Sequence, residues 1–165
     1  MINMDDKDIL RRQLLELLKG GNAHMGLDDA VKDFPIARIN DIFPNGTYSS
    51  WHLLEHIRLS QADILEFIAS PSYKEKKWPR DYWPAEGKKA TGKEWDKTIS
   101  GIKNDTNEIE KLVSDPNIDI YSKAKNGDGQ TILREILLVA DHLAYHISEF
   151  AIMRQVMGTW GKSHE

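Results

Sequence analysis

The chain has 165 residues, enough for one folded domain over 1–165 with a hydrophobic core of its own. Its 22 basic against 26 acidic residues argue against a sequence-independent nucleic-acid protein, which needs a basic face, and the lack of cysteine excludes disulfides, thiolate metal ligands and a cysteine nucleophile. The N-terminal sequence lacks the pattern of a signal peptide and no apolar run approaches the roughly 20 residues that span a bilayer, so we expect a soluble, cytoplasmic protein that needs neither membrane nor nucleic acid.

The first half of the chain predicts two long helices joined by a long connection. Leucine and isoleucine recur at helical spacing from Asp5 to Lys19, just before a pair of glycines. Between residues 22 and 48 two prolines interrupt the pattern, and a short helix is expected near Leu27–Asp33. A serine at 49 or 50 can cap the second long helix, which ends near Ala69 before a Ser-Pro pair.

The second half predicts two more long helices and no sheet. Residues 71–90 are rich in proline, aromatic residues and lysine, and are expected to form a loop. The capping box Thr91–Glu94 opens the third long helix, which ends near Asp115, and the last helix runs from Thr131 to about Met157. No stretch alternates with a period of two. The sequence therefore predicts an all-α protein, a four-helix bundle in a single domain with a long connection between helices 1 and 2.

Four of the six histidines form two HxxxH pairs on separate predicted helices. The pairs are His52/His56 and His142/His146. Six histidines placed at random in this chain would give about 0.2 such pairs. Residues four apart share one helix face, so both imidazoles of a pair can approach the same metal ion. If the second and last helices lie side by side, His56, His142 and His146 can meet.

Three neutral imidazoles suit a divalent transition metal and leave coordination positions open for water or substrate. The spacing leaves open which three histidines, or whether all four, are ligands. Three neighbouring carboxylates are candidates for orienting the rings: Glu149, Asp141 and Glu55. The alternative is a set of hydrogen-bonded core or surface histidines that bind no metal. Paired spacing on two helices of a bundle favours the metal site.

Two segments that contain these histidines, "WHLLEHIRLSQADILEF" and "GDGQTILREILLVADHLAYHISEF", closely resemble the DinB/YfiT-like superfamily. The resemblance implies a four-helix bundle of unusual handedness with a long first connection. It also implies a divalent metal, such as zinc, nickel or iron, held by one histidine of the second helix and two of the last. By position these are His56, His142 and His146. His52 stands outside this triad, as a fourth ligand, a proton shuttle at the pocket mouth or an exposed residue at the helix start; the last two are favoured.

Members of this superfamily have diverse activities, including thiol-dependent S-transferases and isomerases. The resemblance implies a metal-dependent enzyme, an S-transferase or a hydrolase, that activates a low-molecular-weight thiol or water for transfer to a small electrophilic substrate. The thiol has to be external, because the chain has none. The alternative is a non-catalytic, stress-related bundle in which the metal is structural or absent. A homodimer is expected from the habit of the family and from the general preference for symmetric pairs.

Four aromatic residues lie close together in the sequence around the predicted loop: Trp78, Tyr82, Trp83 and Trp95. One interpretation makes them a lid or a subunit interface. The other, which we favour slightly from the sequence, is a satellite cluster that closes one end of the bundle.

Overall fold

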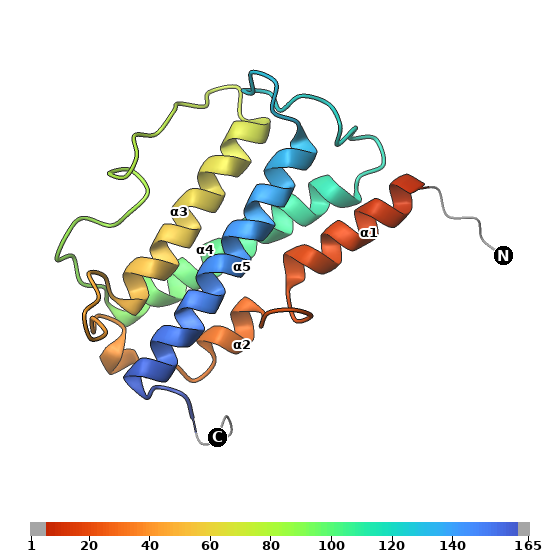
Figure 1. Ribbon diagram of the computed structural model, residues 1–165. Coiled ribbons are helices and arrows are strands. Elements are labelled where there is room, and N and C mark those ends of the chain that lie inside the picture. Colours follow the sequence, from red (N-terminus) through yellow and green to blue (C-terminus); the bar gives the residue numbers. More distant parts are fainter. Residues whose placement is uncertain (1–5, 162–165) are drawn as a thin grey trace.

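The protein is described by a computed structural model that covers residues 6–161 (Figure 1). Over this range it is all-helical, with isolated β-bridges but no strand. The α-helices are α1 (Asp6–Lys19), α2 (Leu27–Val31), α3 (Ser50–Ala69), α4 (Gly92–Ser114) and α5 (Ile132–Met157), and a 3-10 turn, η1, spans Ile36–Arg38. The four long helices and the short one after the first were all predicted, and the all-α class is confirmed.

The long helices begin where side chains can cap them. The Ser49 side chain accepts a hydrogen bond from the backbone N–H of His52, and the His52 ring accepts one from the Ser49 backbone, which completes a capping box at α3. The predicted box of Thr91 and Glu94 forms at α4. Thr131 caps α5, which ends at Gly158 with φ 61°, a left-handed conformation that glycine adopts without strain.

The four long helices enclose one core. Both α1 and α3 pack against α4 and α5, and α2 packs against α5. In Figure 1, α5 runs beside α3 with α4 behind it and α1 on its other side. The core takes residues from each long helix, among them Leu14, Leu18, Trp51, Leu54, Ile57, Ile102, Ile109, Ile136 and Phe150. The contact between α3 and α5 matters most for function, since both histidine pairs lie on these two helices.

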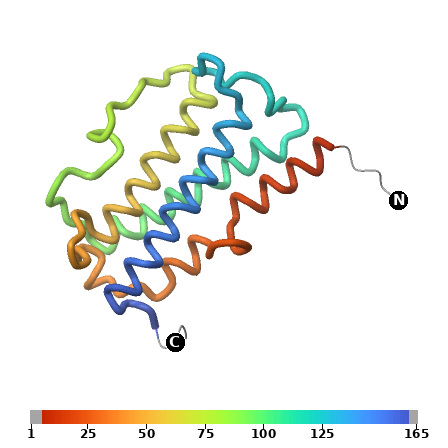
Figure 2. The backbone as a smooth tube through the Cα atoms, in the orientation of Figure 1, coloured from red at the N-terminus to blue at the C-terminus, as the bar shows by residue number. Residues whose placement is uncertain are grey.

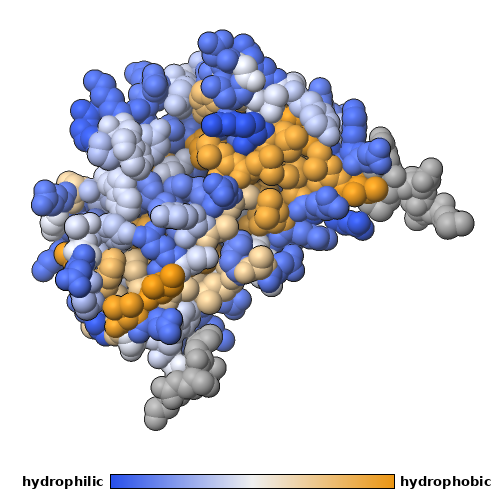
Figure 3. Space-filling view, in the orientation of Figure 1, coloured by the Kyte–Doolittle hydropathy of each residue, from blue (hydrophilic) through white to orange (hydrophobic). Residues whose placement is uncertain are grey.

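Apolar residues dominate α5, on its exposed side as well as on its buried side. By length and composition alone it could cross a membrane, a property that the sequence analysis did not expect, but core helices of soluble proteins pass the same test. Figure 3 shows a broad apolar area over α5 and α1. The large exposed apolar residues on these helices are Leu17, Leu137, Tyr145, Ile152 and Val156.

The loop between α3 and α4 runs back along α3. Figure 2 shows it leaving the end of α3 and returning to the level of its start. Phe67 of α3 packs on Tyr73, with ring centroids 5.3 Å apart. Nearer the start of the helix, the Lys88 ammonium lies 5.3 Å from the ring of Trp51. The loop therefore covers the flank of α3 that carries His56.

Candidate metal centre

Three histidines from two helices converge beside the core. His56 comes from α3, and His142 and His146 come from adjacent turns of α5. Their ligand nitrogens lie within 4.8 Å of one another, and the Nε2 atoms of His56 and His142 are 3.2 Å apart. His56 is buried and the other two are half-buried. Packing of α3 against α5 thus joins the three residues that were predicted as ligands.

The separation of these nitrogens suits a small divalent ion. Two imidazole nitrogens bound tetrahedrally at about 2.0–2.1 Å from zinc lie about 3.3–3.4 Å apart. The His56–His142 pair is already close to that separation, and the third ring lies within 4.8 Å. Neutral nitrogen donors of this kind suit zinc, nickel and iron alike. The donor set therefore fits a divalent transition metal.

Hydrogen bonds fix the tautomers of two of the rings. The Nδ1 atom of His56 lies 2.8 Å from the backbone carbonyl of Tyr82, which can only accept, so Nδ1–H donates. The Nδ1 atom of His146 lies 2.7 Å from a carboxylate oxygen of Glu149 and donates in the same way. A neutral imidazole with a proton on Nδ1 has its lone pair on Nε2. Both rings thus offer Nε2 as the ligand atom.

Glu149 is itself held by a second partner. The Tyr48 hydroxyl donates to the other carboxylate oxygen of Glu149. Burial alone would raise the pKa of Glu149, but the hydrogen bonds from His146 and Tyr48 bring it below its ordinary value. Glu149 is therefore an ionised acceptor that orients His146, as its position three residues after His146 suggested. Tyr48 lies in an irregular segment, and nothing in the sequence pattern pointed to it.

Burial keeps two of the three histidines, His142 and His56, neutral. Burial lowers the pKa of His142 to about 3, and the neighbouring His146 and His56 add to the effect. Burial also lowers the pKa of His56, against the raising effect of the Tyr82 carbonyl. A protonated imidazole cannot bind a metal, so these shifts keep both lone pairs available at neutral pH.

The fourth histidine has a different role. His52 is half-buried at the start of α3, where its Nδ1 lies 2.8 Å from the Ser49 hydroxyl in the capping box. It lines a separate hollow together with Tyr48 and Trp83. Trp83 stacks on His56 with ring centroids 4.0 Å apart. His52 is thus a half-buried helix cap and not the exposed residue that was one expectation, whereas the role of a proton shuttle at the pocket mouth stays a prediction.

Two of the three carboxylates considered for the triad lie elsewhere. Asp141 is exposed on α5, and within residues 6–161 no hydrogen bond joins it to a histidine. Glu55 accepts hydrogen bonds from Arg58 and from Thr98. Asp141 and Glu55 adjoin ligands in sequence, but neighbouring residues on a helix point in different directions. Of the three carboxylates, only Glu149 is hydrogen-bonded to one of the three histidines within residues 6–161.

The aromatic residues of the loop divide into two groups. Trp78 and Trp83 lie against His56, with ring centroids 6.1 Å and 4.0 Å away, and Tyr82 supplies the carbonyl for its ring. Trp95 is instead buried in the core, where its ring lies 5.0 Å from that of Phe34. The four residues therefore do not form the one satellite cluster that was favoured, because the loop residues lie against His56 of the candidate metal centre while Trp95 lies in α4 and in the core.

A pocket of about 390 Å³ opens onto the triad. All three histidines line it, and it extends along α3 and α5 under the loop. Its other walls include Ser60, Asp63, Trp78, Tyr82 and Glu135. A volume of this size holds a small organic molecule. The triad is therefore accessible to a ligand.

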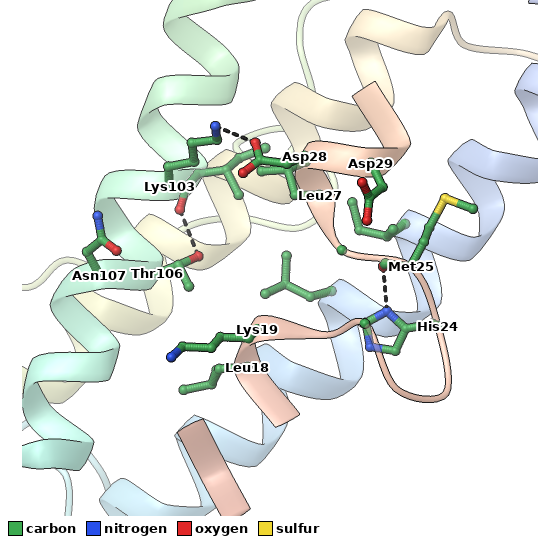
Figure 4. Close-up of a pocket in the computed structure, with 15 residues that line it drawn as sticks. Leu18, Lys19, His24, Met25, Leu27, Asp28, Asp29, Lys103, Thr106 and Asn107 are labelled. Atoms are coloured by element: carbon green, nitrogen blue, oxygen red, sulfur yellow. Dashed lines mark hydrogen bonds and ion pairs between the residues drawn. The ribbon is translucent and has the colours of Figure 1, made fainter. Parts of the chain in front are cut away.

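A second cavity, of about 400 Å³, lies between the end of α1, α2 and α4 (Figure 4). Its one histidine, His24, hydrogen-bonds to the carbonyl of Met25 at 2.9 Å. Asp28 forms an ion pair with Lys103 across its rim. Among the residues that the structure describes, the three histidines are the one group of His, Asp or Glu side chains whose ligand atoms lie close enough together to hold a metal ion. The second cavity has no such group among its described residues.

Comparison of the chain with protein-family models, curated proteins and solved structures found no match. The resemblance to the DinB/YfiT-like superfamily therefore stays a prediction. The case for a metal rests on the geometry of the site, which is independent of that resemblance.

Proposed function

We propose that the protein binds one divalent transition metal through His56, His142 and His146. The observation that carries the proposal is the convergence of the three rings, whose ligand nitrogens lie within 4.8 Å of one another, with the Nε2 atoms of His56 and His142 3.2 Å apart. The lowered pKa values of His142 and His56, which keep both rings neutral, support the same conclusion. Without a metal, such convergence would serve only a hydrogen bond between two imidazoles.

We further propose that the site is catalytic and not only structural, in a bundle of the DinB/YfiT-like kind. Three protein ligands leave a position free, whereas structural zinc sites are closed by four. The pocket that reaches the triad gives a small molecule access to that position. When bound, the metal supplies a Lewis acid that lowers the pKa of water or of an external thiol, for transfer to a small electrophile.

The residues of the chain around the triad have separate tasks. Glu149 accepts a hydrogen bond from Nδ1 of His146, and the Tyr82 carbonyl accepts one from Nδ1 of His56. Each of these bonds keeps its imidazole ring in one orientation. Trp83 stacks on His56 and excludes water from that side of the ring. Ser60 lies on the pocket side, with its hydroxyl 3.4 Å from His56 Nδ1.

Metal analysis of the purified protein tests the first part. Elemental analysis should find one metal per chain in the wild type and in His52→Ala, which serves as the matched control. Each of His56→Ala, His142→Ala and His146→Ala should lose it, because two imidazoles bind far more weakly than three. Equal metal content in all four variants would refute the triad.

Cobalt substitution tests whether the proposed site is catalytic, with a free coordination position. The cobalt-loaded protein should change its visible absorption when a small thiol such as 2-mercaptoethanol is added, since a free coordination position admits the thiolate. A spectrum that stays unchanged at saturating thiol would indicate a closed, structural site. Turnover of a general electrophile such as 1-chloro-2,4-dinitrobenzene should then require both metal and thiol.

A further inference from the structure

The pocket at the candidate metal centre has a second polar end. His56 and Asp63 both line it, seven residues apart on α3, which corresponds to roughly 10 Å along a helix axis. Glu135 lines the same end from α5. Asp63 and Glu135 are 6% and 2% exposed, so the pocket holds two buried carboxylates away from the histidines.

Glu135 and Asp63 differ in the hydrogen-bond partners of their carboxylate oxygens. Glu135 accepts a hydrogen bond of 2.7 Å from Arg134 in an ion pair. One oxygen of Asp63 accepts from the Tyr82 hydroxyl at 2.6 Å. The other oxygen, Oδ1, is buried and has no hydrogen bond of ordinary geometry in the described part of the chain, although burial and the nearby Asp63 carboxylate together raise the pKa of the Tyr73 hydroxyl. A buried carboxylate oxygen without a donor is costly, so this atom calls for a donor.

The nearest cationic side chain, Lys76, indicates which kind of hydrogen-bond donor suits Asp63 Oδ1. The Lys76 ammonium, carried by the loop, lies 3.5 Å from Asp63 Oδ1, longer than an ordinary N–H···O hydrogen bond of about 2.7–3.2 Å. The protein thus places an ammonium group beside Asp63 without completing the bond. Because Lys76 belongs to a covering loop and not to a helix, its ammonium can give way to that of a ligand.

Aromatic rings complete this end of the pocket. Phe67, Tyr73 and Trp78 line it together with the carboxylates. Aromatic faces attract cations, and their apolar surface suits a hydrocarbon body. Arg134 is the one lysine or arginine that lines the pocket, and it is already paired with Glu135. The lining therefore favours a cationic ligand over an anionic one.

We infer that this pocket takes a small molecule with an aliphatic ammonium group, which donates to Asp63 in exchange for Lys76. Its apolar body lies against Phe67, Tyr73 and Trp78, and its other end reaches the three histidines. The inference rests on the proposed function, since it names the substrate class of the same pocket. Binding of the ammonium group itself depends on Asp63 and not on the metal.

Calorimetric titration with a matched pair of probes tests the inference. 4-Phenylbutylamine and 4-phenylbutan-1-ol differ in charge but little in shape, and both are titrated into the full-length protein with and without zinc. We expect the amine to bind at least tenfold more tightly than the alcohol in both forms. The isosteric change Asp63→Asn should bring the two affinities together. Asp141→Asn, which removes the same charge from an exposed position of α5, should leave the preference intact.

A second variant tests the exchange with Lys76 and does not disturb a buried residue. Lys76→Met keeps an unbranched side chain that is one atom shorter and removes the competing ammonium, so the amine should bind severalfold more tightly than in the wild type. Equal affinities for amine and alcohol in the wild type, or a preference that survives Asp63→Asn, would overturn the inference. An unchanged or weaker amine affinity in Lys76→Met would also contradict it.

The proposed metal centre and the proposed class of ligand can be refuted independently of each other. Loss of the amine preference in a protein that still binds metal at the triad refutes the ligand class alone. A protein that binds no metal but prefers the amine refutes the metal centre alone.

Discussion

At the scale of single residues, the site is organised by hydrogen bonds at the Nδ1 atoms of two of the three imidazoles. His146 donates to Glu149, and His56 donates to a carbonyl of the covering loop. Such outer partners fix the ring orientation and raise the basicity of the ligand nitrogen. His52 has the same spacing from His56 as His142 has from His146, but it lies outside the group of three converging histidines and its Nδ1 takes part in the capping box of α3.

Glu149→Gln should weaken metal binding by roughly 10- to 100-fold, because a neutral amide orients His146 but no longer raises its basicity. Competition with a chromophoric chelator measures the dissociation constant. Tyr48→Phe should weaken binding less, since it removes only the partner of Glu149. The control is Glu55→Gln, which removes a carboxylate of α3 bound to Arg58 and should bind metal as the wild type does. Wild-type affinity in Glu149→Gln would contradict an orienting role.

At the scale of elements, capping and packing have separate effects on the site. The predicted bounds of the long helices agree with the structure because side-chain caps and glycine stops are local signals. The loop between α3 and α4 has no local sequence signals of this kind. Its contacts with α3, including the Tyr82 carbonyl and the ring of Trp83, depend on a path that only the folded chain defines.

Ser49→Ala should lower the free energy of unfolding by about 1 kcal/mol, since it removes the N-cap of α3. Urea denaturation measures this change. Metal stoichiometry should stay at the wild-type value, because the cap lies outside the triad. Thr91→Ala at the start of α4 provides a matched comparison of similar cost. Loss of metal from folded Ser49→Ala would show that the α3 start does contribute to the site.

At the scale of the whole molecule, the lowered pKa values of His56 and His142 link metal binding, protonation and folding. A group whose pKa is lowered on folding takes up a proton more readily when unfolded, so protonation favours the unfolded state. The apolar surface of α5 and α1 agrees in character with an interface, but the homodimer remains a prediction.

The metal-free protein should lose stability as the pH falls below about 6.5, the ordinary histidine value, toward the pKa of about 3 for folded His142. Each proton that only the unfolded chain takes up costs at most about 1.4 kcal/mol per pH unit. Urea denaturation between pH 7.5 and 5 measures the slope, in a range above the titration of Glu149. The slope of the free energy of unfolding against pH should be smaller in His142→Gln than in the wild type. Equal slopes in wild type and His142→Gln would contradict the lowered pKa.

The sequence by itself determined the helices, their caps and the two histidine pairs, because each of these depends on residues within a few positions of one another. It also named Glu149, three residues from His146, but only as one of three candidate carboxylates beside Asp141 and Glu55. Only the tertiary structure decided that His56 joins the last-helix pair while His52 caps α3, since the packing of α3 on α5 selects which turn faces the partner. Tyr48, Trp83 and the Tyr82 carbonyl reach the site from irregular segments, whose course depends on contacts distant in sequence.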